Sequence, residues 1–208
     1  MDIYKLIEEA RIVPVIVIED ERDALPLAEA LRKGGINIAE VTFRTEAAKA
    51  SIEIISATYP DMLVGAGTVL TIGQVDEAVK AGAKFIVTPG SNPKVIEYCV
   101  KNNITIIPGC ANPSNVELAL ENGLNVVKFF PAEQAGGINY IKAISAPYGN
   151  VRFMPTGGIN PQNVGSYLKE KCIIACGGSW MVKKDLIANK QFDEITRLCK
   201  EACDIANQ

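Results

Sequence analysis

Short runs of apolar and β-branched residues alternate with segments of helical periodicity along nearly the whole chain. Consecutive runs begin 20 to 26 residues apart, and the segments between them repeat apolar residues every three or four positions, as at Ala24, Ala28 and Leu31. Strands and helices that alternate at this spacing predict parallel βαβ units. The predicted strands are Ile12–Ile18, Ile36–Phe43, Met62–Ala66, Lys84–Thr88, Ile104–Ile107, Asn125–Phe129, Asn150–Met154 and Cys172–Cys176.

Eight such units, followed by a helical segment over 192–205, predict an α/β fold of the (β/α)8 TIM-barrel type. We expect a single domain over residues 1–208 with an N-terminal helix over 2–11. Asn92-Pro93 and Asn112-Pro113 are typical of helix starts, with asparagine as the cap and proline in the first turn. A doubly wound open sheet is the alternative fold. The lack of a Gly-x-Gly-x-x-Gly motif after the first strand disfavours that alternative.

The composition narrows the choice of partners. The chain has 208 residues, a net charge of -3 and 48% hydrophobic residues, which gives no reason to expect binding to nucleic acid or to a membrane surface. No apolar stretch approaches the ~20 residues that a membrane-spanning helix needs. The amphipathic start of the chain lacks the apolar centre of a signal peptide. We therefore expect a cytoplasmic protein.

Histidine is absent from the sequence, which excludes Ser-His-Asp and Cys-His nucleophiles, the usual zinc sites and imidazole acid–base catalysis. The six cysteines show no Cys-x-x-Cys motif. Cys172 and Cys176 are four apart on a predicted strand, and Cys199 and Cys203 are one helical turn apart. These spacings favour buried, inert thiols over a metal site or structural disulfides, so we expect no metal.

Lys128 stands at the carboxyl end of the sixth predicted strand, after an apolar run and shortly before Pro131. A buried ammonium is costly unless it is neutralised, paired or used. In a barrel, the carboxyl ends of the strands form the active site. Strand alternation places Glu40, Thr42 and Arg44 on one face at the mouth of the barrel. One interpretation is a purely structural ion pair of Glu40 with Lys128 or Arg44.

Glycine-rich turns follow the seventh and eighth predicted strands, at Gly157-Gly158 and at Gly177-Gly178-Ser179. Glycines let backbone N–H groups approach an anion, and the following helix N-terminus favours negative charge. Barrels commonly bind phosphate in these two positions. The alternative is that the glycines only form tight turns.

The functional interpretation combines these features. Neutral Lys128 adds to a substrate ketone, and loss of water gives an iminium that accepts electrons. Glu40 shuttles protons, Arg44 holds a carboxylate beside the ketone, and the glycine turns bind a phosphate. The predicted substrate is a small phosphorylated 2-oxo acid, and the predicted chemistry is C–C bond cleavage.

The chain also resembles the 2-keto-3-deoxy-6-phosphogluconate (KDPG) aldolases, a family that overlaps with the 4-hydroxy-2-oxoglutarate aldolases. The resemblance covers essentially the whole sequence. It implies a TIM barrel, a metal-free and cofactor-free class I lyase, usually a homotrimer, that cleaves KDPG to pyruvate and glyceraldehyde 3-phosphate in the Entner–Doudoroff pathway. Five segments carry it: Glu40–Glu46, Val64–Leu70, Lys128–Glu133, Pro155–Ile159 and Gly177–Trp180.

The resemblance further implies a role for each matching residue. Lys128 corresponds to the Schiff-base lysine and Glu40 to the acid/base. The implied substrate-binding residues are Arg44 and Thr68 for the carboxylate, Pro89 and Phe130 for the pyruvyl group, Thr156 near the hydroxyl-bearing carbons, and Gly157, Gly158, Gly178 and Ser179 for the phosphate.

The chain departs from several relatives in the segment Pro108–Asn112, where they read Pro-Gly-x-x-Thr. This leaves the preferred aldol open, although Thr156 favours the gluconate over the galactonate epimer. Two other functions also stay open: a phosphate-binding barrel isomerase or epimerase with Glu40 as base, and a non-catalytic barrel that binds a phosphorylated metabolite. Neither requires a covalent bond to Lys128.

Overall fold

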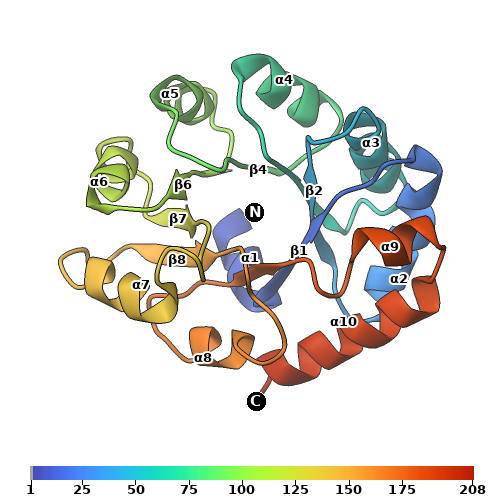
Figure 1. The fold of residues 1–208 in the computed structure, drawn as a ribbon. Coiled ribbons are helices and arrows are strands. Elements are labelled where there is room, and N and C mark those ends of the chain that lie inside the picture. Colours follow the sequence, from blue (N-terminus) through green and yellow to red (C-terminus); the bar gives the residue numbers. More distant parts are fainter. Residues whose placement is uncertain (1) are drawn as a thin grey trace.

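The computed structural model describes residues 2–208, which fold into parallel β-strands surrounded by helices (Figure 1). Six strands form one sheet in the order β5-β4-β3-β2-β1-β9, and three form a second in the order β6-β7-β8. All pairings are parallel. The strands are β1 (Ile12–Ile16), β2 (Ile38–Thr42), β3 (Leu63–Gly67), β4 (Phe85–Val87), β5 (Ile106–Ile107), β6 (Gly109–Cys110), β7 (Val126–Phe129), β8 (Arg152–Pro155) and β9 (Cys176–Gly178).

The helices alternate with the strands and pack their apolar faces against them, as the 3.6-residue periodicity predicts. Asn92 and Asn112 cap their helices by accepting hydrogen bonds from backbone N–H groups in the first turn, so the two predicted Asn-Pro helix starts are confirmed. The helices are α1 (Ile3–Ala10), α2 (Ala24–Lys33), α3 (Ala48–Thr58), α4 (Ile72–Lys80), α5 (Pro93–Lys101), α6 (Pro113–Glu121), α7 (Gly137–Ser145), α8 (Val164–Leu168), α9 (Lys184–Ala188) and α10 (Phe192–Ala206), with a short 3-10 turn η1 (Glu21–Asp23) before α2.

The two sheets approach each other at both of their edges. On one side only Pro108 separates β5 from β6. On the other side, isolated parallel bridges join Phe153 to Ile173 and Thr156 to Gly177. The predicted fifth strand, Ile104–Ile107, is present only as β5, and β6 beyond Pro108 was not predicted. Proline has no N–H to donate to a ladder, which explains why two short strands stand on either side of Pro108.

Helix α1 covers the amino ends of the strands. The Tyr4 hydroxyl donates a hydrogen bond of 3.0 Å to the backbone carbonyl of Ile106, and Arg152 pairs with Glu8 at 2.9 Å. Figure 1 shows α1 among the strands near the centre of the view, whereas the other helices lie at the periphery. The opposite, carboxyl ends of the strands therefore stay open for a site.

The prediction for the last strand was wrong in its position. Residues 172–175 form a turn and an extended segment, and β9 begins only at Cys176. The register explains the shift, because Ile12 and Val13 of β1 pair with Cys176 and Gly177. Cys172 therefore does not share a strand face with Cys176 as predicted; it lies half-buried in the turn.

Among residues 2–208 we find no helix that is both long enough and apolar enough to span a membrane.

Candidate active site

Lys128, near the carboxyl end of β7, and Glu40, in the middle of β2, meet in the interior. Lys128 Nζ lies 3.2 Å from Glu40 Oε1, and their side chains are 5% and 0% exposed. The backbone of Lys128 is fixed by a 2.8 Å hydrogen bond from its N–H to the carbonyl of Pro108. The structure thus brings together the two predicted catalytic residues, which are 88 positions apart in sequence.

This ion pair is not expected to contribute much to the stability of the fold. Removing both charges from water costs several kcal/mol per ion, and their mutual attraction offsets that cost only when all remaining lone pairs are satisfied. Glu40 Oε2 is buried without a hydrogen-bond partner among the described residues. An unsatisfied carboxylate oxygen beside a buried amine is an arrangement expected of a site that handles protons.

Gly67 of β3 leaves the space that Glu40 occupies. A Cβ at this position would lie 2.2 Å from Glu40 Oε1 and 2.7 Å from its Cγ. No real Cβ approaches an atom so closely, so any side chain at position 67 would displace the carboxylate. The sequence motif Gly65-Ala66-Gly67 therefore has a specific steric function in the site.

We expect Gly67→Ala to lower kcat by about 100-fold, because a displacement of about 1 Å at a catalytic group typically costs that much. Steady-state kinetics and thermal unfolding of the same sample check this. Gly73→Ala is the matched control, since a Cβ there meets nothing closer than 3.9 Å, and it should keep wild-type activity. Normal kcat for Gly67→Ala would mean that the position of Glu40 does not limit the reaction.

Arg44 lies in the turn after β2, two residues beyond its last residue, Thr42. Its Nε donates a hydrogen bond of 3.1 Å to Thr68 Oγ1. Thr42 instead donates to the carbonyl of Ile16 at 2.8 Å. We predicted that strand alternation would place Arg44 on the same face as Glu40 and Thr42. That reasoning was wrong, because β2 ends at Thr42, before Arg44. The ion pair of Glu40 is with Lys128 and not with Arg44.

A cavity of about 450 Å3 opens at the carboxyl ends of the strands. Seven of the predicted substrate-binding residues line it. One of them belongs to β9, and the other six lie in the segments that directly follow β2, β7, β8 and β9. Lys128 and Glu40 are not among its lining residues, but Lys128 Nζ is 5.4 Å from the centre of the Phe130 ring, which does line it. The predicted residues in the lining are Arg44, Phe130, Thr156, Gly157, Gly158, Gly178 and Ser179.

The two predicted glycine turns both reach this cavity. Gly157 and Gly158 have φ angles of 101° and 78°, which residues with a side chain rarely adopt. The helices that follow begin only at Val164 and Lys184, several residues beyond the glycines. Lys184, the first residue of α9, nevertheless lines the cavity together with the second glycine turn.

Thr156 contributes a hydroxyl to the same cavity. Its residue is 6% exposed, and its Oγ1 has no hydrogen-bond partner among the described residues. A buried hydroxyl without a partner costs free energy, and a ligand hydroxyl in the cavity would satisfy it.

Pro89 lies at the edge of the site, beside the strand that neighbours Lys128. A Cβ on Gly109 would lie 2.2 Å from the Pro89 carbonyl oxygen, and Gly109 pairs with Lys128 across β6 and β7. Thr88 fixes this corner, since its Oγ1 donates to Gly90 O at 2.7 Å and accepts from Gly109 N at 3.2 Å. The sequence placed Thr88 among the polar residues at strand ends but assigned no role to it or to Gly109.

All six cysteines are free thiols, four of them buried. Burial raises the pKa of Cys110, on β6 next to β7, to about 11, so it is essentially protonated at neutral pH. No group of three His, Cys, Asp or Glu side chains among residues 2–208 is arranged to hold a metal ion.

Known proteins share both the sequence and the structure. A profile of the family described as KDPG and KHG aldolase matches residues 3–198. The 2-dehydro-3-deoxy-phosphogluconate aldolase of Haemophilus influenzae is 50% identical over 98% of this chain and 96% of its own. The KHG/KDPG aldolase of Escherichia coli K12 is 42% identical over 93% of this chain and 91% of its own.

Among solved structures, a KDPG aldolase from Legionella pneumophila superposes with a TM-score of 0.93 at 44% identity, covering 96% of this chain and 97% of that one. In that protein pyruvate was captured at low pH as a covalent carbinolamine intermediate. A carbinolamine is the adduct of an amine and a ketone, so that relative performs the amine chemistry that the buried lysine predicts.

Proposed function

The chain belongs to the KDPG and KHG aldolase family, and from that premise we propose that it is a Schiff-base, class I aldolase. Its main reaction is the cleavage of 2-dehydro-3-deoxy-6-phosphogluconate to pyruvate and glyceraldehyde 3-phosphate. It also cleaves 4-hydroxy-2-oxoglutarate to pyruvate and glyoxylate. The observation that carries the proposal is the buried pair of Lys128 and Glu40, 3.2 Å apart, with Lys128 Nζ beside the Phe130 ring that lines the cavity.

The first half of the reaction joins the substrate to the protein. Glu40 first takes a proton from the Lys128 ammonium. The neutral amine then attacks the C2 ketone while Glu40 gives its proton to the carbonyl oxygen and accepts one from the attacking nitrogen, which gives a carbinolamine and leaves Glu40 protonated. Glu40 then protonates the departing hydroxyl, and water leaves. The product is a protonated imine between Lys128 and C2.

The second half breaks the C3–C4 bond. Glu40, directly or through a water, takes the proton from the C4 hydroxyl; the C4–O bond becomes a carbonyl and the electrons of C3–C4 pass to the iminium. The aldehyde leaves and an enamine remains. Glu40 returns a proton to C3, and water hydrolyses the imine to release pyruvate and regenerate Lys128.

Each part of the substrate, from its carboxylate to its phosphate, has its own set of binding residues in this proposal. Arg44 and Thr68, already joined at 3.1 Å, hold the carboxylate, while Pro89 and Phe130 line the pyruvyl pocket. Thr156 hydrogen-bonds to a substrate hydroxyl through its unpartnered Oγ1. The phosphate lies in the turns at the far side of the cavity, formed by Gly157, Gly158, Gly178 and Ser179.

The isomerase or epimerase alternative, with Glu40 as base and no covalent adduct, has no support among the relatives. All the relatives described above are aldolases, and one forms a covalent adduct with pyruvate. The non-catalytic alternative does not account for a buried amine and carboxylate in contact.

We further infer that the two sheets belong to one (β/α)8 barrel and one domain. The single residue between β5 and β6, together with the bridges from Phe153 and Thr156 to Ile173 and Gly177, supports a closed ring of strands. A homotrimer and a cytoplasmic location stay predictions.

Cleavage assays test the proposed function. Purified protein is mixed with each of the two substrates, and pyruvate is measured with lactate dehydrogenase and NADH. We expect one pyruvate and one aldehyde per substrate consumed, with no requirement for added metal. Interconversion of sugar phosphates without release of pyruvate would favour the isomerase.

A further inference from the structure

The wall of the cavity has a charge opposite to that of the whole protein. Three basic residues, Arg44, Lys183 and Lys184, line it, and no aspartate or glutamate does. The complete chain carries a net charge of -3. A concave surface lined by one sign of charge focuses the field and attracts ions of the opposite sign. The cavity is therefore built for an anion.

The two neighbouring lysines differ in their partners. Lys184 Nζ pairs with Glu19 Oε1 at 2.9 Å, which offsets its charge. Lys183 makes no ion pair within residues 2–208 and is exposed at the cavity. Its ammonium is thus available to a ligand, with three N–H donors and no competing carboxylate in the lining.

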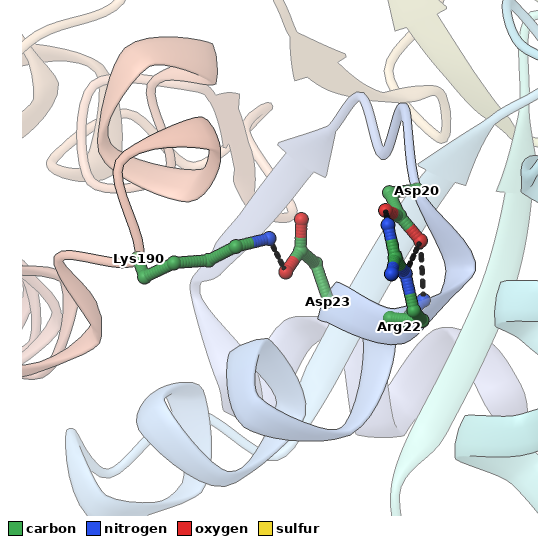
Figure 2. Close-up of polar contacts among 4 residues, drawn as sticks. All are labelled: Asp20, Arg22, Asp23 and Lys190. Carbon is green, nitrogen blue, oxygen red and sulfur yellow. Dashed lines mark hydrogen bonds and ion pairs between the residues drawn. The ribbon is translucent and has the colours of Figure 1, made fainter.

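The segment that carries Lys183 is held in place on both sides. Before it, Met181 and Val182 are buried, and the Val182 N–H donates to the carbonyl of Ser179 at 3.1 Å. After it, the loop beyond α9 is fixed by Lys190, which pairs with Asp23 of η1. Figure 2 shows this contact beside the Arg22–Asp20 pair. Because the Asp23 side chain is only 7% exposed, this is an anchored contact of a buried carboxyl.

We propose that Lys183 binds the substrate phosphate and thereby sets the preference of this enzyme for phosphorylated over unphosphorylated 2-oxo acids. The inference rests on the proposed function and deepens it. Lys183 follows the Gly178-Ser179 turn by four residues, so it adds an unpaired positive charge to the backbone and hydroxyl groups of that turn. Arg44, held by Thr68, remains for the carboxylate that both substrates share.

Kinetics on the two substrates test the proposal, because only one of them carries a phosphate. Lys183→Ala should raise KM for 2-dehydro-3-deoxy-6-phosphogluconate about tenfold, the loss expected for one charge-assisted contact. Its kcat/KM for 4-hydroxy-2-oxoglutarate should stay within about twofold of wild type. Lys183→Arg should restore most of the affinity for the phosphorylated substrate, because the charge is kept.

Lys200→Ala is the matched control. Lys200 is exposed on α10 outside the cavity lining, so this variant changes the net charge equally and should leave both substrates unaffected. An equal loss on both substrates with Lys183→Ala, or no loss on either, would overturn the proposal.

Binding of inorganic phosphate separates this proposal from the proposed function. Titration calorimetry of the free protein should show a Kd about tenfold weaker in Lys183→Ala than in wild type or Lys200→Ala, and a difference that shrinks at high salt. If wild type cleaves neither substrate but binds phosphate about tenfold more tightly than Lys183→Ala, the proposed reaction is refuted and the role of Lys183 in anion binding is supported. Equal phosphate affinity in all three proteins would refute the role of Lys183.

Discussion

Lys128→Ala is expected to lower kcat for 2-dehydro-3-deoxy-6-phosphogluconate by at least about 10⁴-fold, because the covalent route through the imine no longer exists. No other lysine in the described part of the chain could take its place, because Lys128 is the only lysine there that is itself buried. Pyruvate release over hours, at high protein concentration, measures the residual rate.

The same variant should also be less stable. Removing Lys128 leaves the Glu40 carboxylate, which is 0% exposed, without its counter-ion, and breaking a buried pair in this way typically costs about 3–5 kcal/mol. Thermal or urea unfolding measures the difference. Activity assays of this variant therefore need a temperature at which circular dichroism shows it to be folded.

The double variant Lys128→Met/Glu40→Gln separates catalysis from folding. Methionine keeps much of the lysine stem volume and glutamine keeps the shape of glutamate, so no buried charge is left unpaired. We expect it to unfold at a higher temperature than Lys128→Ala and to be equally inactive. Substantial turnover by the stable double variant would show that the loss in Lys128→Ala came from misfolding.

Glu40→Gln has the second-largest expected effect. The substitution keeps the size of the side chain but removes the group that carries protons to and from the substrate. General acid–base groups typically contribute 10²–10⁴-fold, so kcat should fall by about that factor. Exchange of the pyruvate methyl protons with deuterated water, followed by proton NMR, isolates the step at C3 from cleavage.

Lys128 remains in Glu40→Gln, so this variant should still form a covalent adduct with pyruvate. The combination of slow methyl exchange and retained adduct formation assigns Glu40 to proton transfer. Exchange at the wild-type rate would mean that another group moves the proton, and Glu40 would then be only the counter-ion of Lys128.

The alternation of strand and helix was predictable because each element repeats a simple pattern with its own period. Lys128 and Glu40 were predictable for a related reason. A charge at the carboxyl end of an apolar strand is unusual, and the parallel order of strands brings all such ends to one side. Local pattern and topology together were therefore enough to place two residues that are distant in sequence.

The features that could not be predicted depend on contacts between distant segments. The start of β9 is set by its pairing with Ile12 and Val13, not by its own apolar content, which is higher just upstream. The need for glycine at position 67 arises from where Glu40 lies. Lys183 resembles any other surface lysine in the sequence. Only the folded cavity distinguishes it from Lys200, and only the ion pair of Lys184 with Glu19 distinguishes it from Lys184.

The measurement that most directly tests the central claim is borohydride trapping with pyruvate, followed by intact-mass and peptide analysis. We expect one reduced pyruvyl group per chain, attached to Lys128, in wild type and in Glu40→Gln, and none in Lys128→Ala. An active, folded wild-type sample that gives no adduct, or an adduct on a different lysine, would contradict it.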